Sequence, residues 1–183
     1  MCNPYPKEDL FMEQGEGEIR IYVACLASYN NGILHGVWID ATQSVEVIHD
    51  QISAMLNASQ IEDAEEYAIH DYEGFEGVPI FETQSIESVI ETAAFIMEHG
   101  ALGGKLISYF GDLEEASEAI SDRYAGQYAS LEDFARELTE ETTDIPQNLA
   151  FYIDYERMAR DLEISDVITI ETGFEDVHVF WSH

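Results

Sequence analysis

His70 and Asp71 form the pair of adjacent residues that most resembles a metal site, because metal-dependent phosphohydrolases use a His-Asp dipeptide. Such a site needs further His and Asp residues at helical spacings. This pair instead falls in an expected strand over residues 66–72, where neighbouring side chains point to opposite faces. The chain has no H-x-x-x-H, H-E-x-x-H or C-x-x-C spacing, and no EF-hand, P-loop, G-x-G-x-x-G or G-x-S-x-G pattern. We therefore expect a protein that is not an enzyme and that holds no cofactor or metal ion.

The two cysteines and most aromatic residues have simple structural interpretations. Cys2 and Cys25 provide no disulfide framework, and Cys25 lies in an apolar run typical of a small core residue. We expect the tyrosines and tryptophans mainly in cores and module interfaces. Tyr152, Ile153 and Tyr155 exceed what one small module can bury, which leaves open a homodimer seam in the last module.

Charge is the strongest signal in the composition. The chain of 183 residues has 38 Asp and Glu against 7 Lys and Arg, a formal net charge of −31. Phosphate groups are bound by Lys and Arg, so this balance argues against nucleic acid or an anionic membrane as a direct partner. It favours a basic protein surface, a cation or a high-salt medium. Because 46% of the residues are hydrophobic, the charge does not imply disorder.

The carboxylates also lack basic neighbours. No Lys or Arg occurs between Arg20 and Lys105 or after Arg160, so Glu–Lys pairs four residues apart are almost absent. Most carboxylates must therefore face water or a partner, and on the expected helices they form regular stripes opposite the apolar face. The candidate phosphate-mimic surface, called here the sixteen mimic carboxylates, consists of Glu62, Asp63, Glu65, Glu66, Glu87, Glu91, Glu98, Asp112, Glu114, Glu115, Glu118, Asp122, Asp133, Glu137, Glu140 and Glu141.

The charge density is comparable with that of DNA. Duplex DNA carries one charge per ~1.7 Å of axis, so 31 charges correspond to roughly 53 Å of duplex. A compact chain of this length has a diameter of about 40 Å. A surface with the charge density of DNA is therefore quantitatively reasonable.

The pattern of elements predicts an α+β protein, an elongated chain of three small modules after a flexible leader over residues 1–17. Residues 18–84 combine a small sheet, with strands at 19–26, 33–39 and 66–72, and a helix that Ser44 caps. Asn31-Gly32 predicts a hairpin turn between the first two strands. Residues 85–123 form a helical middle module. Ser85 caps a first helix over 86–99, and Gly100 suits the position just after its end. Gly103-Gly104 breaks the helical pattern before a second helix over 112–123. Residues 124–183 form an α+β module with helices at 131–141 and 146–162 and a closing hairpin that turns at Thr172-Gly173. Ser130 and Asp133 resemble a capping box, with Asp in place of the usual Glu, at the start of the first of these helices.

Targeting signals are not apparent. The first eighteen residues lack the basic and apolar regions of a signal peptide, and no apolar run is long enough to span a membrane. We expect a cytoplasmic protein.

Three segments resemble motifs of the ArdA antirestriction family. Residues 22–32, YVACLASYNNG, followed by Gly36-Val37-Trp38, resemble the family's N-terminal hairpin. Residues 65–73, EEYAIHDYE, resemble its central motif, and residues 152–163, YIDYERMARDLE, its C-terminal motif. The three occur in family order, and the resemblance covers about residues 19–181.

This resemblance implies an elongated, three-module, homodimeric DNA mimic carried by a mobile genetic element. Members of the family occupy the DNA-binding cleft of type I restriction–modification enzymes, formed by the methyltransferase core with its specificity subunit. They block cleavage and often modification. The leader over residues 1–17 is an extension beyond the family core.

Two alternatives remain open from the residues alone. An acidic binding module for another basic DNA-binding protein would have the same charge. A salt-adapted enzyme would also have an acidic surface, although no catalytic motif accompanies it here.

Overall fold

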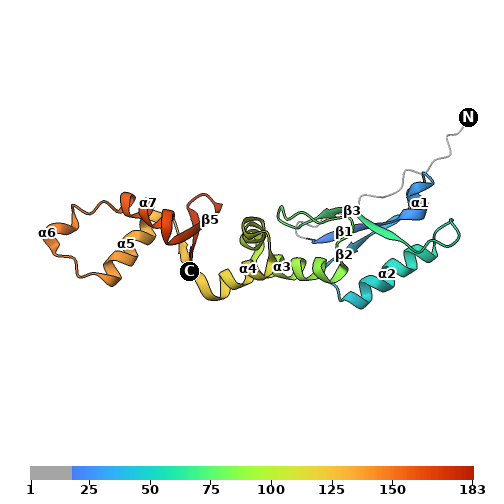
Figure 1. The fold of residues 1–183 in the computed structure, drawn as a ribbon, viewed down its shortest axis with the longest axis horizontal. Coiled ribbons are helices and arrows are strands. Elements are labelled where there is room, and N and C mark those ends of the chain that lie inside the picture. The colour runs from blue at the N-terminus through green and yellow to red at the C-terminus, as the bar shows by residue number, and fades with distance from the viewer. Residues whose placement is uncertain (1–17) are drawn as a thin grey trace, which may run out of the picture. The chain divides into compact units, whose positions relative to one another are not determined.

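The computed structural model describes residues 18–183, which form two compact units, one that ends at Gly74 and one over Phe75–His183. Each unit combines helices with a three-stranded antiparallel sheet (Figure 1), which confirms the predicted α+β class. The predicted leader, residues 1–17, lies outside the described residues. The predicted module boundaries at residues 84 and 123 stay a prediction.

The first unit is a sheet with one long helix packed on it. Strand β1 (Arg20–Cys25) lies between β2 (Gly36–Asp40) and β3 (Tyr67–Glu73), antiparallel to both. Helix α2 (Val45–Asn57) packs against β1 and β2, and its apolar face is buried. The predicted Ser44 cap is confirmed, since its side chain accepts a hydrogen bond from the Val47 amide. Burial of this face against the sheet holds the unit together.

The connection between β1 and β2 differs from the predicted hairpin turn. The two strands do pair, but residues Leu26–Asn30 form a short helix, α1, and β2 begins at Gly36. The Cys25 sulfur accepts a hydrogen bond from the Ser28 amide, and the Asn31 side chain donates to the Ala27 carbonyl. The Asn31-Gly32 pair therefore ends a helical turn, with Gly32 at φ +75°, and does not form a two-residue hairpin.

The second unit contains six helical segments and a sheet with strand order β4-β6-β5. Phe134, Val167 and Val179 form one buried cluster of this unit, with Leu131, Leu138, Leu162 and Trp181 packed around them. The elements are α3 (Ile86–Phe110), α4 (Leu113–Glu118), the π-helix η1 (Ala119–Arg123), β4 (Tyr124–Tyr128), α5 (Leu131–Thr142), α6 (Gln147–Ala150), α7 (Tyr155–Ser165), β5 (Val167–Gly173) and β6 (Asp176–Trp181).

The glycines of α3 confirm the prediction at Gly100 and contradict it at Gly103-Gly104. Gly100 has a non-helical backbone, with φ 56° and ψ −139°, where the first middle helix was expected to end, whereas Gly103 and Gly104 lie inside the helix and are buried. A Cβ atom on Gly104 would lie 2.4 Å from Glu76 Cβ and 2.7 Å from the Glu76 carbonyl oxygen. Gly104 therefore allows the segment before the helix to approach its backbone closely, and the break falls one turn earlier.

Three further elements depart from the predicted boundaries. The single helix expected over 146–162 is two helices, because Asp154 begins α7 by accepting a hydrogen bond from the Arg157 amide. The closing hairpin turns at Phe174-Glu175, two residues later than predicted. Strand β4 was not predicted at all, and the helix before it ends in the π-helical turn η1.

Candidate acidic interaction surface

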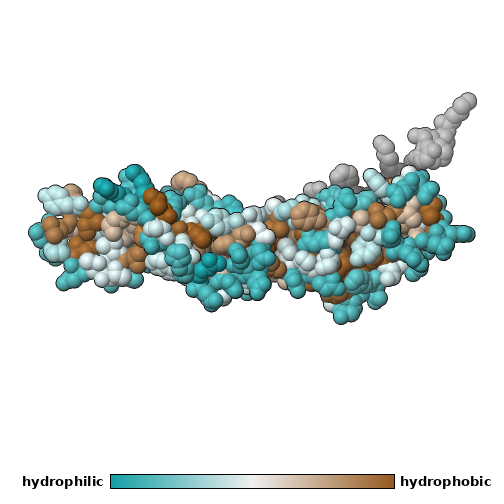
Figure 2. Space-filling model, in the orientation of Figure 1, coloured by the Kyte–Doolittle hydropathy of each residue, from teal (hydrophilic) through white to brown (hydrophobic). Residues whose placement is uncertain are grey.

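Fifteen of the sixteen mimic carboxylates are exposed, and Asp133 is half-buried. Four of them, Glu62, Asp63, Glu65 and Glu66, lie in the connection between α2 and β3 of the first unit. The other twelve belong to the second unit, on α3, α4, η1 and α5 and at the cap of α4. Hydrophilic side chains cover much of the visible face of both units, with apolar patches between them (Figure 2).

The structure brings one subset of these carboxylates together in a groove between α3 and α4. Glu91 on α3 and Asp112, Glu114 and Glu118 around α4 line a groove of about 520 Å³, together with the hydroxyls of Ser88, Ser117 and Ser121. Asp112 has a second role, because its Oδ1 accepts a hydrogen bond from the Glu115 amide at 3.0 Å and caps α4. This groove presents carboxylates and hydroxyls and is lined by a single apolar residue, Leu113.

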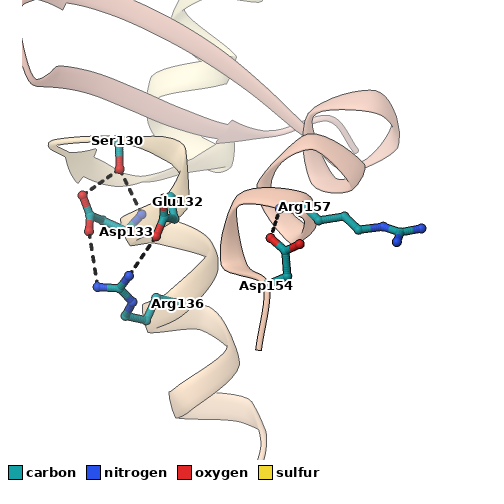
Figure 3. Close-up of polar contacts among 6 residues, drawn as sticks. All are labelled: Ser130, Glu132, Asp133, Arg136, Asp154 and Arg157. Atoms are coloured by element: carbon teal, nitrogen blue, oxygen red, sulfur yellow. Dashed lines mark hydrogen bonds and ion pairs between the residues drawn. The ribbon is translucent and has the colours of Figure 1, made fainter. Parts of the chain in front are cut away.

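Asp133 forms hydrogen bonds that stabilise the start of α5. Its amide and carboxylate both bond the Ser130 hydroxyl, at 3.2 Å and 2.7 Å, in the predicted capping arrangement (Figure 3). Arg136 lies 3.9 Å from the same carboxylate and 2.9 Å from Glu132. Asp133 is therefore the member of the set that is least available to a partner.

The remaining carboxylates of α5 lie along its exposed side. The Tyr128 hydroxyl donates to Glu137 at 3.1 Å, and burial together with this acceptor raises the pKa of Tyr128. Glu140 and Glu141 line a cavity of about 530 Å³ with Asp144 and Tyr155. The other four helical members are Glu87 in the first turn of α3, Glu98 further along α3, Glu115 on α4 and Asp122 on η1. Glu98 lies 4.0 Å from His99.

The described cations neutralise few of these groups. The second unit has 24 carboxylates and 5 basic residues, a net charge of −19. Lys105 and Arg123 donate to backbone carbonyls, of Glu171 and Glu115 respectively, and Arg160 pairs with Glu156. Like-charge neighbours three or four residues apart oppose helix formation, so this surface is maintained against a folding cost.

One acid–base cluster lies on the second sheet, where His178 is buried, Asp176 is half-buried and Tyr124 is exposed. The Tyr124 hydroxyl and His178 Nδ1 are 2.8 Å apart, and His178 Nε2 lies 3.5 Å from Asp176 Oδ1. Burial lowers the pKa of His178 and raises that of Tyr124, and the hydrogen bond from Thr172 lowers the pKa of Asp176. These contacts link β4 to β6 through Tyr124 and His178, and β5 to β6 through Thr172 and Asp176.

Two negative findings apply to residues 18–183. No group of three or more His, Cys, Asp or Glu side chains there is arranged to hold a metal ion. None of the helices in this range has the length and apolar character needed to cross a membrane. His70 and Asp71 do lie on strand β3, as predicted; the His70 ring packs edge-on against Tyr29, and Asp71 Oδ1 accepts the Tyr72 amide.

Sequence reasoning left out a second group of exposed carboxylates in the last 30 residues. Glu156, Glu163, Glu171 and Glu175 surround a groove between α7 and the β5–β6 hairpin. The available signal was the spacing of seven between Glu156 and Glu163, which places both on one face of a helix.

A comparison with protein-family models gives one match, to the family described as antirestriction protein (ArdA), over residues 21–176 of the 183. A search of curated proteins found no match.

Proposed function

The chain belongs to the ArdA family of antirestriction proteins, and from that premise we propose that it is a DNA mimic. It occupies the DNA-binding site of a type I restriction–modification enzyme, formed by the methyltransferase core with its specificity subunit, in the cytoplasm. Restriction is inhibited because the enzyme's site is filled, and modification is inhibited for the same reason. No reaction is catalysed by the chain itself.

The observation that carries this proposal is the exposure of fifteen of the sixteen mimic carboxylates without enough cations to neutralise them. A DNA-binding site is lined by Lys and Arg that bind phosphates. Carboxylates three or four residues apart on a helix are about 5–6 Å from one another, a spacing that suits such a lining. The groove of Glu91, Asp112, Glu114 and Glu118 adds a carboxylate cluster contributed by two helices.

We also propose that two copies associate through the segment around α6. Leu149 is 52% exposed, Phe151 95% and Tyr152 82%, an unusual density of open apolar surface for one loop. Phe151→Asp places a charge in this seam, and we expect sedimentation to report the monomer mass. A dimer that persists at micromolar concentration in this variant would exclude the segment as the seam.

The proposal is tested by the cleavage of unmodified plasmid by a purified type I restriction enzyme with increasing amounts of this protein. We expect inhibition that excess non-specific duplex DNA relieves. Absence of inhibition with several such enzymes would favour the second candidate, an acidic module that binds another basic DNA-binding protein. Capture of a nucleoid protein or transcription factor, displaced by duplex DNA, would then identify that partner class.

A further inference from the structure

The second unit contains a groove that none of the sixteen mimic carboxylates lines. It lies between the start of α5, one face of α7 and the β5–β6 hairpin, with a volume of about 500 Å³. Its apolar lining includes Leu131, Ala159 and Val177, of which Ala159 is buried and the others half-buried. The groove therefore offers an apolar surface long enough for the alkyl part of a side chain.

Phe174 is one of the residues that line this groove. It is 92% exposed, although it is a large apolar side chain, and it occupies the turn between β5 and β6. A hairpin turn needs no aromatic residue, and an exposed phenyl ring contributes little to folding. Its ring face is available to a ligand from solution.

The charge around the groove is strongly negative. Five glutamates and one arginine line it, a net charge of −4. Glu156 is paired with Arg160, Glu132 with Arg136, and Glu163 accepts a hydrogen bond from Thr169. Among the described residues the carboxylates of Glu171 and Glu175, on either side of Phe174, have no hydrogen bond or ion pair.

At two other places in this chain, an arginine guanidinium lies against an aromatic ring and beside a carboxylate. The Arg20 guanidinium lies 4.8 Å from the Trp38 ring centre and 2.7 Å from Glu73. The Arg136 guanidinium lies 5.1 Å from the Tyr155 ring centre and 2.9 Å from Glu132. A guanidinium suits this combination because it is planar, weakly hydrated and always charged.

We propose that the groove binds an arginine side chain from the partner, with its guanidinium between the Phe174 ring and the carboxylates of Glu171 and Glu175. The alkyl part of the arginine lies on the apolar lining. This inference rests on the proposed function for the identity of the partner, a basic segment of the restriction enzyme's DNA-binding surface. The complex would then be held by the Phe174 ring as well as by carboxylates spread over the surface.

The first test uses the restriction enzyme's methyltransferase core and the variant Phe174→Ala. We expect about a tenfold loss of affinity with an unchanged dependence on salt, because no charge is removed. Phe81→Ala is the matched control, since Phe81 is also an exposed phenylalanine of this unit, at 67%, and lies outside the groove. Equal affinities for Phe174→Ala and the wild type would overturn the inference and leave the proposed function intact.

The second test needs no restriction enzyme. An acetylated and amidated hexapeptide of alternating arginine and glycine is titrated into the full chain and followed by NMR, with citrulline in place of arginine as the neutral control. We expect saturable shifts of amides in residues 171–177 with the arginine peptide, lost in Phe174→Ala. Shifts spread evenly over the acidic surface, or shifts that persist in Phe174→Ala, would refute the groove. Saturation at the groove without inhibition of cleavage would instead count against the proposed function.

Discussion

The α3–α4 groove allows the mimic surface to be tested with a triple substitution. Glu91→Gln, Glu114→Gln and Glu118→Gln remove three exposed carboxylates whose side chains have no ion pair or hydrogen bond among the described residues. Asp112 is kept because it caps α4. The variant should fold normally. Loss of the repulsion between like charges should stabilise it by a few tenths of a kcal/mol per pair.

The expected loss of affinity follows from the charge removed. Two unit charges about 4 Å apart in water attract by about 1 kcal/mol. Three lost contacts of this strength with enzyme cations therefore weaken binding by about 3 kcal/mol, or roughly 150-fold. The slope of log affinity against log salt should fall by at most roughly 2.7, since each contact contributes about 0.9.

A second triple variant separates local from total charge. Asp50→Asn, Glu82→Gln and Asp161→Asn change three exposed carboxylates outside the mimic set, so both variants have a net charge of −28. Affinity for the methyltransferase core is measured for both by competition with labelled duplex DNA at several salt concentrations. We expect the groove variant to lose more than tenfold and the second variant less than threefold, as about 1 kcal/mol separates such values. Equal losses of affinity in the two variants would refute the assignment of the groove as a binding surface. Total charge alone would then explain the affinity.

Three further predictions concern the fold that presents this surface. Gly104→Ala should lower the free energy of unfolding by about 1–2 kcal/mol, because the Cβ clash with Glu76 exceeds the gain in helix propensity. Urea denaturation measures this change, and an unchanged midpoint of unfolding would disprove the close approach of Gly104 and Glu76. Ser44→Ala should cost about 1 kcal/mol and Ser44→Asp much less, since aspartate also caps a helix. His178 has a lowered pKa in the folded state, so its stabilising effect is complete above its ordinary value of 6.5 and is lost as the pH falls from there toward the folded pKa. His178→Gln should therefore lose less stability than the wild type between about pH 7.5 and pH 5, and parallel losses would contradict the linkage.

The parts of the fold that depend on neighbouring residues were predictable from the sequence. Ser44, Ser85 and Ser130 all accept the expected amide hydrogen bonds and begin α2, α3 and α5. A cap is formed within four residues, so its signal is local. The same holds for the alternation of the closing hairpin, whose strands pair as expected.

The parts that depend on distant contacts were not predictable. Strand β4 has the sequence YAGQY, whose central Ala and Gly disfavour a strand. It forms because β6 pairs with it, with Gly126 at φ 143° near an irregular register. Gly104 was taken as a helix breaker because its contact with Glu76, which is distant in sequence, is invisible locally. In both cases a tertiary contact decided the local structure.

The candidate site shows the same division. Exposure of the mimic carboxylates followed from the scarcity of basic residues, and the structure places fifteen of sixteen at the surface. The hydrogen bond between Asp133 and Ser130 was predicted by the capping pattern in the sequence. The meeting of Glu91 with the α4 carboxylates depends on how two helices pack, which no single-sequence pattern contains.

The most direct test of the central claim is equilibrium competition between this protein and labelled duplex DNA for the methyltransferase core of a type I restriction enzyme. If both occupy one site, the apparent Kd for DNA should rise in proportion to the protein concentration while the signal at saturating DNA stays unchanged. A ternary complex of enzyme, DNA and this protein, or an apparent Kd that reaches a plateau, would contradict the claim.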